Sequence, residues 1–234
     1  MKLVPALAAA LLSTAAHSAD FGSVGSLAQD EFRALTQELG AAFSYKGVTP
    51  ATPLGVLGVD VGVEVTDTRV DNSQLFSRAG AGSVSDIVVP KLHVYKGLPA
   101  GFDIGAFIGG ASEVGATLLG ADLRYALVDD TLTSPAFALR FAGTRATGLG
   151  DLKVWTASLD AMISKRFALF TPYAGGGLVR THATVDNSTL SDESANRGRG
   201  FIGANLNLVA ANVAIEAERM GSNTSLSVKL GFRF

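Results

Sequence analysis

The chain has 234 residues and a formal net charge of −2; hydrophobic residues make up 47% of it and charged residues 17%. Soluble domains usually carry roughly 25% charged residues, so this sequence is apolar and poor in charge. The near-neutral balance argues against nucleic acid as a partner, and the lack of cysteine excludes disulfides and thiolate metal sites. Beyond the N-terminal stretch, no run of about 18 apolar residues predicts a transmembrane helix.

Residues 1–19 have the pattern of a secretory signal peptide. Lys2 supplies the positive start, residues 3–12 form an apolar stretch too short to span a bilayer, and residues 16–18 fit a small-x-small cleavage site. We expect cleavage after residue 18 or 19, and therefore an exported protein.

Residues 20–54 are expected to form a helical segment ahead of the main domain. Over residues 26–40, Phe32, Leu35 and Leu39 fall on one face of a helix. Ser26 can cap the start of this helix and Gly40 suits its end. The apolar face requires a buried partner on the domain that follows, so we interpret the segment as a plug.

From residue 55 to residue 234 the apolar residues recur at every second position, which is the period of a β-strand. The first run, Leu57 to Val65, alternates aliphatic residues with glycine, aspartate and glutamate. We identify ten such runs of roughly eight to fifteen residues, closer to the length of a transmembrane strand than to that of a soluble one. Eight or twelve strands are also compatible, because the glycine-rich runs can be split or merged.

The opposite face of these strands is polar and carries both signs of charge in near-equal numbers. A lining of one sign would have indicated ion selectivity, whereas a mixture indicates a narrow interior filled by salt bridges. The predicted lumen-lining residues are Asp60, Glu64, Asp103, Asp122, Arg124, Arg140, Asp160, Arg180, Asn205, Asn207, Glu216, Glu218, Lys229 and Arg233.

The last ten residues, 225–234, resemble the closing strand of Gram-negative outer-membrane β-barrels, which alternates apolar residues and ends in an aromatic. Phe234 and Phe232 match the positions of that assembly signal. The resemblance implies an all-β fold, a closed antiparallel transmembrane barrel over residues 55–234. It also implies outer-membrane lipid and the barrel-assembly machinery as partners.

Alternate gaps between strands should lie at the same end of the barrel. This assigns the two longest gaps, residues 67–85 and 183–199, to the outer side, where they are candidate contacts for an external ligand. The helix over 26–40 is then expected to plug the periplasmic mouth or to lie in the periplasm. Aromatic residues near strand ends are candidates for interfacial girdles: Tyr95, Tyr125, Trp155, Phe167 and Tyr173.

Three functions fit the sequence. The first is a structural or passive small-solute transport role. The second is transport of hydrophobic solutes gated by the N-terminal helix. The third is an envelope hydrolase that uses His182. Because histidines are few and isolated, we expect no enzyme activity, no metal site and no cofactor.

Overall fold

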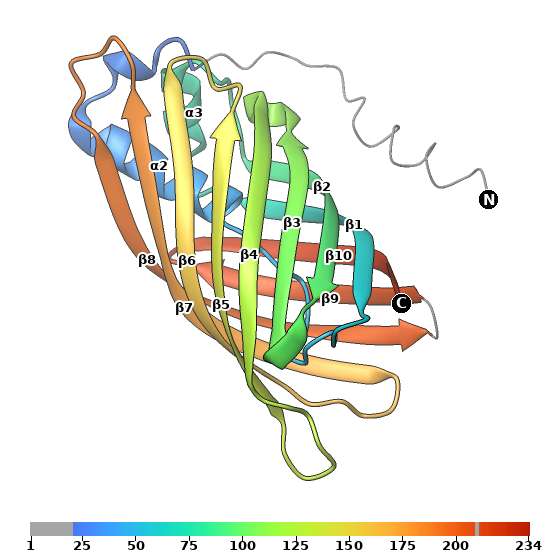
Figure 1. Cartoon of the computed structure of the whole chain (residues 1–234). Coiled ribbons are helices and arrows are strands. Elements are labelled where there is room, and N and C mark those ends of the chain that lie inside the picture. Colours follow the sequence, from blue (N-terminus) through green and yellow to red (C-terminus); the bar gives the residue numbers. More distant parts are fainter. Residues whose placement is uncertain (1–20, 209–210) are drawn as a thin grey trace.

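The computed structural model describes residues 21–208 and 211–234, which form one closed antiparallel barrel of ten strands (Figure 1). Each strand pairs with its neighbours in sequence, and β1 pairs with β10 to close the barrel. The ten-strand prediction is confirmed, while the predicted signal peptide lies outside the described residues. The strands are β1 Val59–Arg69, β2 Asp86–Gly97, β3 Phe102–Ala111, β4 Ala116–Val128, β5 Ala136–Thr147, β6 Leu152–Ser164, β7 Phe170–Val185, β8 Glu193–Leu208, β9 Ala211–Met220 and β10 Asn223–Arg233.

The two ends of the barrel differ in their connections. We call one end the loop end; its connections are residues 70–85, 112–115, 148–151, 186–192 and 221–222. We call the opposite end the terminal end, because β1 begins there and β10 finishes there. The longest connection, 70–85, contains the short helix α3 (Ser73–Ala79), which the sequence analysis did not predict. The expected loop 183–199 is shorter than predicted, because β7 continues to Val185 and β8 begins at Glu193.

Alternation along the strands separates an inner from an outer surface. In β1, Asp60 and Glu64 are buried in the lumen, whereas Val61 and Val65 are exposed on the outside. Of the five aromatic residues assigned to girdles, Tyr125, Trp155 and Phe167 are exposed. That assignment is wrong for Tyr95 and Tyr173, whose side chains are buried inside the barrel.

The main helix, α2, spans Gln29–Phe43 and thus starts and ends three residues later than predicted. The Ala28 N–H donates to Glu31 Oε2 at 3.0 Å, which fixes the start. Gly40 lies within the helix instead of ending it. Its lack of a side chain lets the helix pack against β7, because a Cβ at this position would lie 2.1 Å from Thr181 Oγ1. Short 3-10 turns occupy Val24–Ser26, Pro99–Gly101 and Ser112–Val114. Among the described residues, no helix is long and apolar enough to cross a membrane.

Helix α2 lies inside the barrel at the loop end, beside α3 and the start of β8 (Figure 1). The expectation that it sits at the opposite, periplasmic mouth is therefore wrong. Residues 44–58 run in irregular conformation from α2 to the start of β1 at the terminal end. Fifteen residues can span up to about 50 Å. This stretch is therefore long enough to connect the start of β1 at the terminal end with a helix at the loop end.

Candidate functional site: the lumen and its N-terminal segment

Residues 21–58, here the N-terminal segment, are fastened at the loop end by contacts to two connections. The Phe21 and Phe76 rings lie 6.4 Å apart between centroids, which joins the segment to α3. Glu193 at the start of β8 accepts hydrogen bonds from Gln29 Nε2 at 2.7 Å and from Arg33 Nε at 3.1 Å. The segment is therefore attached to both the 70–85 connection and the edge of β8.

Glu38 of α2 forms a second attachment at this mouth. Its carboxylate accepts hydrogen bonds from the Asn223 side-chain amide and, at 3.1 Å, from the Asp71 N–H. Burial raises the pKa of Glu38 above its ordinary value, while the Asn223 hydrogen bond opposes that shift. The contact is thus sensitive to the protonation of one carboxyl group.

The lumen near the loop end is apolar. Phe32, Leu35 and Leu39, the predicted plug face, are fully buried in one cluster with side chains from the strands. Barrel residues in this cluster include Ile87, Val89, Phe107, Ala142, Leu152, Val154 and Ala183. Burying three large side chains of this kind contributes on the order of 5–9 kcal/mol before entropic costs, so the apolar face holds the helix in the barrel.

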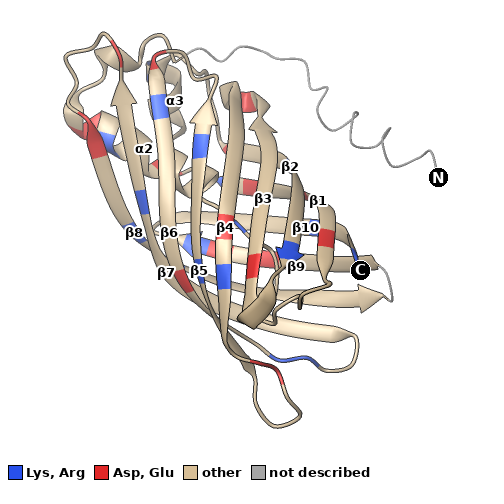
Figure 2. Cartoon of the chain, in the orientation of Figure 1, with Lys and Arg blue, Asp and Glu red and all other residues tan. Residues whose placement is uncertain are grey.

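Below the helix, a layer of charges binds the chain as it leaves α2 (Figure 2). Arg199 of β8 bonds Asp160 through two contacts of 2.6 and 2.8 Å and donates to the Tyr45 carbonyl at 2.7 Å. Lys46 donates to the Ala41 carbonyl at 2.7 Å and lies 3.4 Å from Glu218. Arg199, Asp160 and Lys46 are each at most 5% exposed, so these ion pairs are shielded from solvent.

Tyr45 lies at the centre of a buried aromatic group at the same level. Its hydroxyl donates to Asp122 Oδ1 at 2.6 Å and lies 2.9 Å from the Tyr95 hydroxyl. Its ring stacks against His93, with centroids 5.9 Å apart, and packs against Phe107 at 5.3 Å. The segment therefore passes through the barrel centre in close contact with β2, β3 and β4.

At the terminal end the segment is held by backbone contacts. Arg124 donates to the Pro50 carbonyl at 2.5 Å and pairs with Asp103 at 2.6 Å. Asp103 also accepts from the Leu54 N–H at 3.0 Å, and Ser164 Oγ accepts from the Ala51 N–H at 3.1 Å. All residues from 38 to 51 are buried, so the barrel encloses the middle of the segment without interruption.

The structure places most of the predicted lumen residues inside the barrel. Eleven of the fourteen are buried: Asp60, Glu64, Asp103, Asp122, Arg124, Arg140, Asp160, Asn205, Glu216, Glu218 and Lys229. Arg233 and Asn207 are half-buried near the terminal mouth, where Arg233 pairs with Asp60 at 2.7 Å. These two also line a small cleft of about 160 Å³ at that mouth.

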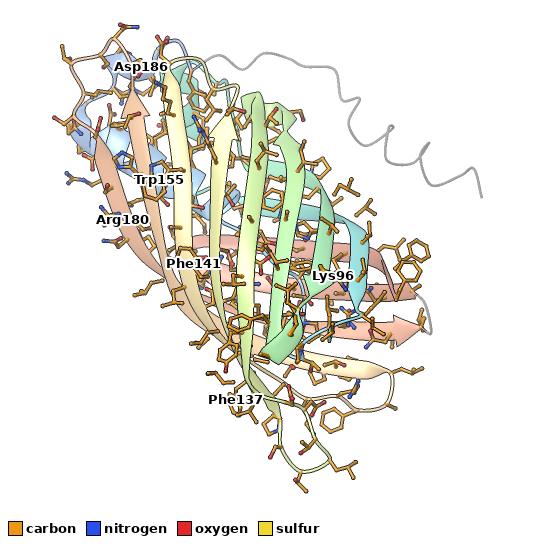
Figure 3. The ribbon with its side chains drawn as sticks, viewed as in Figure 1. Lys96, Phe137, Phe141, Trp155, Arg180 and Asp186 are labelled. Atoms are coloured by element: carbon orange, nitrogen blue, oxygen red, sulfur yellow. The ribbon has the colours of Figure 1, made fainter. Side chains whose placement is uncertain are left out.

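Arg180 is not a lumen residue: its side chain is exposed on the outside of β7 (Figure 3). The inward positions of this strand include the apolar Val179 and Ala183, and a glycine run precedes them. Residue type therefore misidentified the inner face of β7. His182 shares the outer face, where its Nδ1 lies 2.9 Å from Ser194 Oγ and its ring is 5.4 Å from Trp155.

Sequence reasoning missed two residues that hold the segment. Lys46 lies in the irregular stretch before the strands, where alternation gives no signal. Arg199 fell within the predicted loop 183–199, although β8 already begins at Glu193. An arginine two residues before the alternation starting at Phe201 is the signal that could have extended the strand.

Metal binding finds no support in this part of the chain. Within residues 21–208 and 211–234, no three His, Asp or Glu side chains are grouped so as to hold an ion.

The outer surface carries large apolar side chains around the barrel. Ile104, Leu119, Leu159, Ile215 and Val228 are each 47–56% exposed on different strands. A closed barrel leaves no unpaired edge, and an aliphatic exterior is favourable in lipid rather than in water. The chain is an outer-membrane β-barrel of a Gram-negative bacterium. In such barrels the longer loops face the cell exterior and both barrel termini face the periplasm. The loop end is therefore external, and α2 occupies the external mouth.

The predicted assembly-signal residues close this barrel. Phe232 is 48% exposed and stands opposite Val61 of β1, while Phe234 exchanges backbone hydrogen bonds with Val59 at 2.9 and 3.0 Å. Both therefore lie on the seam between the first and last strands.

No family model and no curated protein matches the sequence. Among solved structures, the KdgM porin is 8% identical with a TM-score of 0.40, covering 76% of this chain and 99% of the porin. The outer membrane protein OprG of Pseudomonas aeruginosa is 10% identical with a TM-score of 0.37, covering 80% and 99%. The translocator domain of the autotransporter NalP from Neisseria meningitidis is 14% identical with a TM-score of 0.42, covering 94% and 100%. These are likenesses of fold, and the barrel assignment rests on this chain's own strand pairing.

Proposed function

We propose that this protein is a closed barrel with a structural role in the outer membrane, and that its lumen is occupied by its own N-terminal segment. The observation that carries the proposal is the unbroken burial of residues 38–51 inside the barrel. A passive channel requires a continuous aqueous path through the lumen. Here the N-terminal segment of the same chain occupies that path.

The contacts of the segment favour a permanent plug over a gate. Leaving the barrel would separate Lys46 from Glu218 and Tyr45 from Asp122, both of them buried. Breaking one side of a buried ion pair costs about 3–5 kcal/mol, and orphaning a hydrogen-bonded group costs about 1–3 kcal/mol. Gated transport of hydrophobic solutes would also require the apolar face of α2 to detach, so we rank it second.

The hydrolase alternative keeps one observation, the 2.9 Å contact between His182 and Ser194 across β7 and β8. A nucleophilic serine requires a histidine base that a third group orients. A carboxylate could orient His93, which lies 3.2 Å from Glu64. His182 instead contacts the neutral side chains of Ser194 and Trp155, neither of which is an acidic orienting group. We therefore expect phospholipid and peptide substrates to remain intact with the full chain, as with a His182→Ala variant. Hydrolysis that is lost in both His182→Ala and Ser194→Ala would establish the enzyme instead.

Planar-bilayer recording tests the closed-barrel proposal. We expect the full chain to give no stepwise conductance, and a variant that lacks residues 21–58 to give stable steps. A Thr52→Cys/Ser164→Cys pair, whose wild-type hydroxyl oxygens lie 3.3 Å apart, provides a cross-linked control that should stay silent before and after reduction. Heat-modifiable migration on gels establishes that each variant is folded. Steady ohmic steps from the full chain would refute the proposal, whatever the deletion shows.

A further inference from the structure

Strands β5, β6 and β7 carry basic side chains on their outer surface near the loop end. Arg145, Trp155 and His182 are direct cross-strand neighbours and form one row. Lys153 lies two residues nearer the loop end and Arg180 two residues farther from it, about 7 Å per step. All are exposed except His182, which is half-exposed. We call Arg145, Lys153, Trp155, Arg180 and His182 the basic face.

The basic face lies directly above the apolar belt of the barrel. The row below Arg180 consists of Phe141, Leu159 and Leu178, which are 60%, 56% and 68% exposed. Figure 3 shows the same order from the loop end downward: Asp186, Trp155, Arg180 and Phe141. Tryptophan favours the boundary between hydrocarbon and headgroups. The basic face is therefore at headgroup level in the outer leaflet.

A cleft of about 570 Å³ opens on this face, lined by Arg145, Lys153, Trp155, His182 and Thr184. Lys153 pairs with Asp186 at 2.5 Å, but both side chains are about half-exposed, so the pair is weak. Among the described residues, no carboxylate forms an ion pair with Arg145 or Arg180. Arg145 thus gives the cleft a positive charge outside any ion pair, and the exposed Arg180 lies next to the cleft.

The densest group of outward basic side chains near the loop end lies on β5, β6 and β7, whereas β9 carries the single exposed Arg219. On β1 and β2, the outward residues near the loop end are Asp67, Arg69 and Asp86, in which both signs occur. A general preference for basic residues at the outer rim would not produce this asymmetry. It points to a particular anionic partner on the β5–β7 side.

We propose that the basic face binds the phosphorylated glucosamine headgroup of lipid A, the glycolipid of the outer leaflet. Its phosphates lie at the hydrocarbon boundary, next to Arg180 at the lower edge of the basic face, and Arg145 and Lys153 follow one and two steps nearer the loop end. Arginine and lysine bind phosphate oxygens through charge-assisted hydrogen bonds, and basic pockets at headgroup level recognise anionic lipids. The Trp155 ring supplies an apolar surface for the sugar and the first methylenes. The proposal holds whether the lumen is closed or open.

Fluorescence provides a local test, because Trp155 is the only tryptophan of the chain. The full chain in neutral detergent micelles is titrated with bisphosphoryl lipid A, with lipid A stripped of phosphate, and with phosphatidylglycerol. We expect saturable binding of the first, with affinity falling about fivefold for each basic charge removed and roughly 100-fold in Arg145→Gln/Lys153→Gln/Arg180→Gln. A matched Arg69→Gln/Arg219→Gln variant, changed at exposed positions on other faces, should stay within about twofold of wild type.

Two results would overturn the proposal. One is a triple variant that binds bisphosphoryl lipid A as tightly as the matched control does. The other is equal affinity of the wild-type chain for phosphatidylglycerol or for phosphate-free lipid A, which would assign the face to generic anionic or apolar lipid. Heat-modifiable migration of all three proteins establishes that they are folded.

Discussion

Replacing Arg199 by methionine should destabilise the folded barrel more than any change of a single exposed charge. The Arg199 guanidinium joins three parts of the molecule: Asp160 on β6, Glu218 on β9 and the carbonyl of Tyr45 in the N-terminal segment. Methionine fills much of the same volume but removes all of these contacts.

The expected magnitude follows from what the carboxylates retain. Removing one partner of a buried ion pair costs about 3–5 kcal/mol when it leaves an uncompensated charge. In this variant Asp160 keeps Arg140 at 3.1 Å, and Glu218 keeps Lys46 at 3.4 Å. Partial compensation places the loss near the lower limit, at about 3 kcal/mol in the free energy of unfolding.

Urea unfolding in detergent micelles, followed by Trp155 fluorescence and by gel migration, measures this loss. Arg219→Met is the matched control, because Arg219 is exposed on β9 and its side chain donates to the Gly221 carbonyl. We expect the control to change stability by less than about 0.5 kcal/mol. If Arg199→Met unfolds within that same margin of wild type, the charge layer does not hold the segment and our reasoning is wrong.

Two further predictions concern α2. Gly40→Ala should destabilise the barrel by about 1–3 kcal/mol, despite the better helix propensity of alanine, because its Cβ would collide with Thr181. Urea unfolding of this variant and of Gly40→Ala/Thr181→Ala tests the collision. If the double variant does not recover stability, the prediction is contradicted. The raised pKa of Glu38 means that the folded barrel favours the protonated carboxyl, so this contribution to stability is complete below about pH 4.5 and is lost as the pH rises through the raised pKa. Glu38→Gln stays neutral and can still accept from Asn223, so it should flatten the stability-versus-pH curve above pH 4.5, and an unchanged curve would argue against the assignment.

The alternation of residue types predicted the barrel well because each strand borders two different environments. Aliphatic residues such as Leu159 face lipid, and charged residues such as Asp160 face the interior. This contrast fails where the interior is itself apolar. On β7 the inward Val179 packs with Ala41 and Met220, so Arg180 on the other face looked like the lumen residue.

The path of the N-terminal segment was harder to predict from sequence. The apolar face of α2, formed by Phe32, Leu35 and Leu39, requires burial, but either mouth of a barrel can provide it. What decides the mouth is the length of the irregular stretch 44–58 and the partners of Lys46 and Tyr45 on distant strands. Such pairings join residues far apart in sequence, and no local period records them.

The accessibility of the lumen to a water-soluble thiol reagent tests closure most directly, because the chain contains no cysteine of its own. Thr156 is 3% exposed and faces the lumen from β6, whereas Ser222 is exposed in the β9–β10 turn. We predict that Thr156→Cys in the full chain reacts at least about 100-fold more slowly than Ser222→Cys, and that deleting residues 21–58 removes most of this difference. Equal rates for the two cysteines in the full chain would show that the lumen is open and would contradict the account.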